Sequence, residues 1–78
     1  MEKLERPIIV PWDFSQVAEN AFQHAVNISK VVNRDILLLH IAHDSKDKEA
    51  KEAELKASSE KLGKEYGRKP FYEVVKGS

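Results

Sequence analysis

Two short runs of apolar residues constrain the fold of this chain more than any other feature. Residues 8–10 and residues 36–39 are continuously apolar and do not alternate with polar residues. Continuous runs of this kind are typical of strands in a parallel sheet whose two faces are both covered by helices. We therefore expect two parallel strands that are buried on both faces.

The residues between these runs carry the pattern of an amphipathic helix. Ser15 is well placed to begin it, because its hydroxyl can accept a hydrogen bond from a backbone N–H two or three residues later. The helix should continue to about Val32, with residues 33–35 as the turn into the second strand. Apolar and small residues recur along it at spacings of three and four and form one stripe that should face the sheet. The stripe consists of Ala18, Ala21, Phe22, Ala25, Ile28, Ser29 and Val32.

The second half of the chain predicts one more helix and one more strand. Residues 47–66 are rich in Ala, Glu and Lys, which favour a helix with a largely solvated surface. Gly63 or Gly67 can end this helix through a left-handed residue. Residues 71–75 are aromatic or β-branched except for Glu73 and predict a third strand. The expected fold is α/β, with a three-stranded parallel sheet in the order 3-2-1, which is half of a doubly wound fold.

The composition excludes several classes of function. Thirteen basic and thirteen acidic residues cancel, so nothing attracts the chain generally to nucleic acid or anionic membranes. The absence of cysteine excludes disulfides and thiolate metal sites. Residues 1–6 lack the apolar core of a signal peptide, and no apolar run approaches the roughly 20 residues that span a bilayer. We expect a cytoplasmic protein that binds neither nucleic acid nor membranes.

The turn after the first strand carries the candidate site residues. Ligands of parallel α/β folds collect beyond the carboxyl ends of the strands, here residues 11–13 and 40–42. Asp13 can bond a ribose hydroxyl or a phosphate-bound cation, or it can serve only to stabilise the turn and the positive end of the helix. Trp12 can stack on a base, fill the pocket, or pack under the first helix or at a subunit contact. Pro11 shapes the turn and removes a backbone donor.

The two strand ends also carry a resemblance to a known family. The chain reads Val-Pro-Trp-Asp-Phe-Ser at residues 10–15 and Leu-Leu-His-Ile at residues 38–41. These motifs resemble the universal stress protein family, whose first strand ends in a Val-Pro-x-Asp-x-Ser type of turn and whose second ends in Leu-Leu-His-Val or similar. The resemblance implies a Rossmann-like fold of the adenine nucleotide alpha hydrolase type. It also implies a stress-response protein whose complete domain binds ATP, with magnesium, in a regulatory role.

The resemblance assigns nucleotide contacts to Pro11, Asp13 and the backbone of Ile41, whose side chain we expect in the core. Trp12 departs from the small or β-branched residue usual at its position. Complete family domains are about twice as long and carry a glycine-rich phosphate loop after a fourth strand, a pattern that the glycines of this chain lack. We therefore expect residues 1–78 to be the N-terminal half of a domain, which binds ATP weakly at best.

Two alternatives remain open. The chain can belong to a non-nucleotide-binding branch of the same family that acts as a dimerisation or scaffold module. An open edge on the first strand predicts self-association, as a homodimer, in either case. A related adenylating enzyme or flavoprotein is disfavoured, because the loop at residues 10–15 lacks the glycines of those enzymes.

The sequence supplies no catalytic residue, and we do not expect an enzyme beyond slow ATP hydrolysis in a complete domain. Ser15 is explained as a helix cap. His40, between Leu39 and Ile41, is typical of a structural histidine. His43 could be drawn with Asp44 and Asp13 as a metal cluster, but an incidental loop histidine is the favoured interpretation, and no metal site is predicted.

Overall fold

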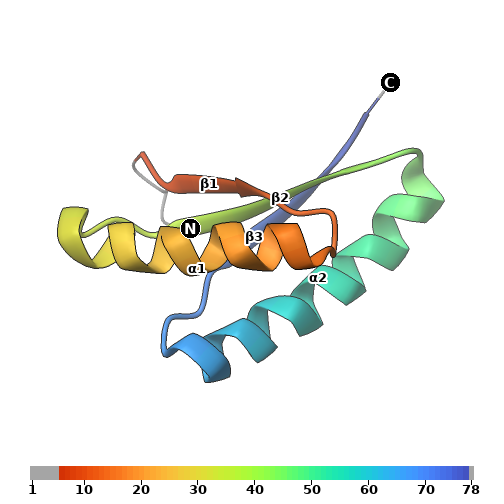
Figure 1. Cartoon of the computed structure of the whole chain (residues 1–78). Coiled ribbons are helices and arrows are strands. Elements are labelled where there is room, and N and C mark those ends of the chain that lie inside the picture. Colours follow the sequence, from red (N-terminus) through yellow and green to blue (C-terminus); the bar gives the residue numbers. More distant parts are fainter. Residues whose placement is uncertain (1–5, 78) are drawn as a thin grey trace.

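A computed structural model of the chain describes residues 6–77 (Figure 1). Residues 1–5, part of the segment considered above as a signal peptide, and residue 78 lie outside the described part. The predicted succession of strand, helix, strand, helix and strand is confirmed. Its elements are β1 (Ile8–Pro11), α1 (Gln16–Val32), β2 (Ile36–Ala42), α2 (Ser45–Tyr66) and β3 (Phe71–Lys76).

The three strands form one parallel sheet with β2 in the centre, in the order β1-β2-β3. This is the predicted arrangement. Pro11 at the end of β1 lies beside Leu39, and Ala42 at the end of β2 lies beside Lys76. Because the strands run in the same direction, the carboxyl ends of β1 and β2 meet at one edge of the sheet.

Helix α1 begins and ends where the sequence predicts. The hydroxyl of Ser15 accepts a hydrogen bond from the backbone N–H of Ala18 at 3.2 Å, and Asn33 ends the helix in a left-handed conformation with a φ of 55°. The predicted stripe is partly wrong, because Ala21, Ile28 and Val32 are exposed while Val26 is buried. The buried face is therefore turned by about one column of side chains around the helix axis. It consists of Ala18, Phe22, Ala25, Val26 and Ser29.

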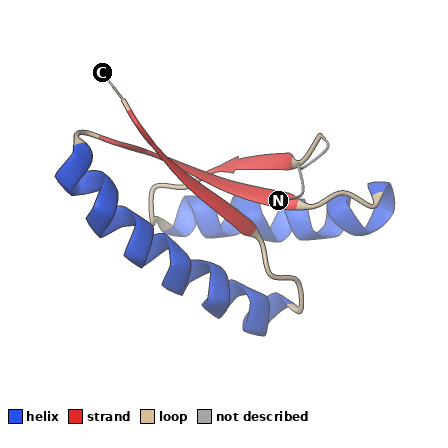
Figure 2. Cartoon of the chain, turned by 180° about the vertical axis from the view of Figure 1, so that it is seen from behind, coloured by secondary structure: helices blue, strands red, loops and turns tan. Residues whose placement is uncertain are grey.

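Both helices lie on the same face of the sheet, as Figures 1 and 2 show from opposite sides. Two crossovers of the same hand that step in the same direction across a sheet place their helices on one side. The expectation that the strands are covered on both faces is therefore wrong for the described residues. Ile9 is 54% exposed and Ile41 is 64% exposed.

We call the bare side of the sheet the uncovered face. Side chains alternate along a strand, and paired residues of neighbouring parallel strands point to the same side. Leu38 and Val74 face the helices, so their chain neighbours face away from them. The uncovered face carries Ile9, Pro11, Leu37, Leu39, Ile41, Phe71, Glu73 and Val75.

Helix α2 has the mostly solvated surface that the sequence predicts, begins two residues earlier than expected, and is capped at both ends. Asp44 begins it, with its carboxylate accepting from the backbone N–H of Asp47 at 2.8 Å. Gly67 ends it in a left-handed conformation with a φ of 73°, whereas Gly63 lies inside the helix. Its buried residues are Leu55, Ser59 and Leu62. Neither helix of residues 6–77 is both long and apolar enough to cross a bilayer.

The core lies between the helices and the sheet. Phe22, Leu38 and Leu55 are fully buried there. The two helices meet through the rings of Phe22 and Tyr66, whose centroids lie 5.4 Å apart in an edge-on arrangement. Trp12, which follows β1, is only 6% exposed and belongs to the same core. The segment that carries the candidate site residues is therefore anchored to the rest of the fold.

Candidate functional site at the strand ends

The four site residues predicted from the sequence line one pocket of about 530 Å³. Pro11 is the last residue of β1, Trp12 and Asp13 follow it directly, and Ile41 lies near the end of β2. The parallel pairing of these strands brings them together. The remaining lining residues are mostly apolar and come from α1 and β2: Val17, Ala18, Ala21, Leu39 and His40.

Asp13 is hydrogen-bonded to Ser15, the N-cap residue of α1. Its Oδ1 accepts a hydrogen bond from the hydroxyl of Ser15 and another from the backbone N–H of Ser15 at 3.0 Å. These bonds, that of the hydroxyl foremost, hold the pKa of the Asp13 carboxyl below its ordinary value of 3.8. Asp13 thus stabilises the turn, as one interpretation of the sequence has it. Its side chain is also exposed in the pocket, so the contact to a ligand stays a prediction.

Trp12 packs in the core beneath α1, one of the placements that the sequence left open. With 6% of its surface exposed, its ring offers little area for a base to stack on. Its backbone oxygen accepts a hydrogen bond from Nδ1 of His40 at 2.6 Å. The indole forms part of the pocket wall and holds the loop in place.

The side chain of Ile41 is not in the core, contrary to the expectation above. It is 64% exposed on the uncovered face, while its neighbour Ala42 is buried. The reason is the alternation of side chains along β2, which places Leu38, His40 and Ala42 on the helix side. Ile41 can still offer its backbone to a ligand, as the resemblance implies.

The backbone of Ile41 points past the end of β1. In a parallel ladder the N–H and C=O groups of alternate residues point to the same neighbouring strand. The backbone oxygen of Leu39 accepts from the backbone N–H of Trp12 at 2.8 Å. The N–H and C=O groups of Ile41, two residues later, therefore also point to the β1 side. Strand β1 ends at Pro11, opposite Leu39. Ile41 therefore presents a donor and an acceptor beyond the last rung of the sheet.

His40 has the structural role that its apolar neighbours predict. Besides its bond to Trp12, its ring packs edge-on against Phe14 with the centroids 5.1 Å apart. His43 is exposed, and its backbone N–H donates to a carboxylate oxygen of Asp47 at 3.0 Å. Within residues 6–77 no three histidine or acidic side chains gather closely enough to hold a metal ion.

Sequence reasoning missed three residues at this end of the sheet. Phe14 takes a left-handed conformation with a φ of 63°, and the ammonium of Lys51 lies 5.3 Å from the centre of its ring. Nothing in the sequence marks a phenylalanine for this backbone conformation, which ordinary residues avoid. Val17 and Ala21 line the pocket from α1. Their positions four and eight residues after Asp13 are a signal that could have identified them.

Comparison with known proteins gives one match. The sequence profile described as Universal stress protein family matches residues 5–69, a span that runs from before β1 to beyond α2 and contains Pro11, Trp12, Asp13 and Ile41. Searches of curated proteins and of solved structures gave no significant match. The profile covers well over half of the chain, so this chain belongs to the universal stress protein family.

Proposed function

We propose that this chain supplies the nucleoside-binding part of a regulatory ATP site. The observation that carries the proposal is the convergence of Pro11, Asp13 and the free backbone of Ile41 on one pocket at the ends of parallel strands. Ligands of α/β sheets bind at such ends. The role is regulatory and not catalytic, with at most slow ATP hydrolysis in a complete domain.

The pocket suits a nucleoside. Pro11, Val17 and Ala21 offer apolar walls to the faces of a base. The N–H and C=O of Ile41 can pair with the edge of adenine, which carries both a donor and an acceptor. The exposed Asp13 carboxylate can accept from the ribose hydroxyls.

The described residues of this pocket offer the phosphates no cationic partner. Among residues 6–77 neither Lys nor Arg lines it, and Asp13 is itself an anion. Gly63 and Gly67 lie within and at the end of α2, away from any strand-to-helix turn that could cradle a phosphate. We therefore propose that residues 1–78 form the N-terminal half of a domain whose phosphate loop is elsewhere, and that this chain alone binds ATP weakly.

Calorimetric titration with adenosine, ATP and ATP with magnesium tests this proposal. We expect adenosine and ATP to bind with similar dissociation constants, on the order of millimolar, because only the nucleoside is held. Magnesium should add little. Micromolar binding of ATP, with adenosine much weaker, would contradict the account of the missing phosphate contacts.

A pair of variants tests the role of the Ile41 backbone. Ile41→Pro removes the proposed donor without touching a ladder bond to β3, whereas Ile41→Val keeps the backbone and shortens only an exposed side chain. We expect the proline variant to lose adenosine binding and the valine variant to retain it, with circular dichroism as the check on folding. Equal binding by both variants would exclude the Ile41 backbone as a contact.

The uncovered face favours a second candidate function, a dimerisation or scaffold module. Ile9, Ile41 and Phe71 are all about half exposed or more, and β1 pairs only with β2 in the described sheet. An open strand edge beside an apolar face is a surface that another chain can cover. Sedimentation at several concentrations, with and without adenosine, separates the two functions. Self-association that is the same with and without adenosine favours the scaffold function. A monomer at all concentrations counts against that function.

A further inference from the structure

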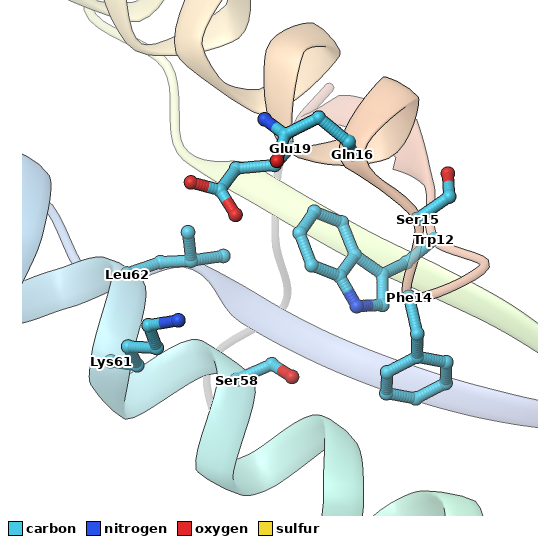
Figure 3. A pocket seen from close by; sticks show the side chains of 8 residues that line it. All are labelled: Trp12, Phe14, Ser15, Gln16, Glu19, Ser58, Lys61 and Leu62. Carbon is cyan, nitrogen blue, oxygen red and sulfur yellow. The ribbon is translucent and has the colours of Figure 1, made fainter.

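A second pocket lies on the helix side of the sheet, between the first turn of α1 and the middle of α2 (Figure 3). Its volume is about 200 Å³. Trp12, Phe14 and Glu19 line it on the α1 side, and Ser58, Lys61 and Leu62 line it on the α2 side. Trp12 thus forms part of the wall of both pockets.

The indole N–H of Trp12 is a buried donor without a partner. Its nitrogen exposes less than 1 Å² and makes no hydrogen bond to any of residues 6–77. Native proteins rarely leave a buried N–H unpaired, because its lost hydration is not replaced. In Figure 3 this nitrogen is directed to the α2 side of the pocket. An indole nitrogen can only donate, so the group that satisfies it must be an acceptor.

The charged groups of the pocket lie on opposite walls. Lys61 projects from α2 and Glu19 projects from α1, as Figure 3 shows. Among residues 6–77 these two side chains are the charged residues of the lining, and their charges cancel. Oε2 of Glu19 accepts from the hydroxyl of Tyr66 at 3.3 Å, which fixes the carboxylate at this place. A simple anion would meet the repulsion of Glu19, whereas a molecule with separated opposite charges satisfies both walls.

We propose that this pocket binds a small free α-amino acid as its zwitterion. On binding, the side chains that now cover the Trp12 nitrogen move aside, so that the carboxylate accepts from its N–H and faces Lys61, and the ammonium group faces Glu19. Phe14 and Leu62 supply the apolar contact for a short side chain. The volume of about 200 Å³ accommodates amino acids of about the size of alanine or valine.

The only tryptophan of the chain is the proposed contact, so its fluorescence reports binding directly. We expect a saturable change of emission when the full chain is titrated with L-alanine, and a matching dissociation constant from calorimetry. Acetate and ethylamine each carry one of the two charges. Each should bind at least about tenfold more weakly than L-alanine.

Two variants with matched controls locate the site. Lys61→Met and Glu19→Gln should each weaken L-alanine binding by about tenfold or more, because each removes one charge partner. Glutamine keeps an acceptor for the hydroxyl of Tyr66, so the wall stays in place. The controls Lys64→Met and Glu60→Gln make the same changes on α2 outside the lining and should bind L-alanine like the parent chain.

Three results would overturn the proposal. The first is the absence of any saturable change with L-alanine, which means that water alone occupies the pocket. The second is acetate that binds as tightly as L-alanine, which would make the pocket an anion site. The third is equal weakening by Lys61→Met and Lys64→Met, which would place the effect outside the pocket.

Discussion

Nδ1 of His40 lies 2.6 Å from the backbone oxygen of Trp12 and joins the end of β2 to the segment that follows β1. A carbonyl oxygen only accepts, so Nδ1 carries the proton of this bond. The ring of Phe14 rests against the same imidazole. His40 therefore holds the loop that carries Asp13 in its place above the strand ends.

His40→Leu should destabilise the fold by about 1–2 kcal/mol, because the bond to Trp12 is lost while an apolar side chain of similar size remains. Urea denaturation measures the difference. His24 is exposed on α1, and His24→Leu should stay within about 0.5 kcal/mol of the parent chain. Equal losses in the two variants would show that the His40 bond contributes nothing.

The pKa of Asp13 should depend on Ser15. The bonds from Ser15 favour the ionised carboxylate in the folded state, so the folded pKa lies below the unfolded one. Their stabilisation is complete above the ordinary pKa of 3.8 and is lost as the pH falls through the lowered value. Ser15→Ala should raise the pKa of Asp13 toward its ordinary value, as an NMR titration of the carboxyl carbon measures. Ser45→Ala, at the start of α2, should leave it unchanged.

Gly63 and Gly67 should respond differently to alanine. A Cβ at Gly63 would lie 2.9 Å from Cβ and 3.1 Å from Cα of Lys69, so Gly63→Ala should destabilise the fold by about 1–3 kcal/mol despite a better helix propensity. A Cβ at Gly67 meets open space, but the positive φ makes Gly67→Ala cost about 1 kcal/mol. Gly67→Asn should cost less than Gly67→Ala, because asparagine tolerates this conformation. Thermal denaturation of the three variants measures these differences in stability. A Gly63→Ala variant more stable than the parent chain would contradict the close approach to Lys69.

Ile41→Glu should abolish self-association through the uncovered face. The side chain is 64% exposed, so the monomer should lose no more than about 0.5 kcal/mol of stability. Val31→Glu is the matched control, because Val31 is 85% exposed on α1, away from that face. Sedimentation velocity of the two variants and the parent chain measures the effect. Assembly that survives Ile41→Glu but not Val31→Glu would move the interface to the helix side.

The local structure of this chain could be predicted because it depends on short-range chemistry. The Ser15 cap, the end of α1 at Val32 and the helix-forming composition of α2 each rest on residues within a few positions of one another. The parallel order of the strands follows from the alternation of strands and helices. The convergence of Pro11, Trp12, Asp13 and Ile41 follows from that order, because strand ends meet at one edge.

The surroundings of each element could not be predicted from the same patterns. A continuous apolar run such as residues 36–39 is the same sequence whether one or two faces of its strand are covered. Val26 is buried and Ile28 is exposed because the position of α1 over the sheet, and of Tyr66 beside Phe22, sets which column of side chains faces inward. The pocket between the helices combines residues 12–19 with residues 58–62, a pairing that no local pattern reports.

Because both helices lie on the same side of the sheet, the opposite side of a folded monomer is an exposed hydrophobic surface. Dyes whose fluorescence increases in apolar surroundings should bind this surface at low temperature, before any unfolding begins. Melting curves recorded with such dyes would start bright and rise little for a monomer, so calorimetry or circular dichroism is the sound way to follow its denaturation.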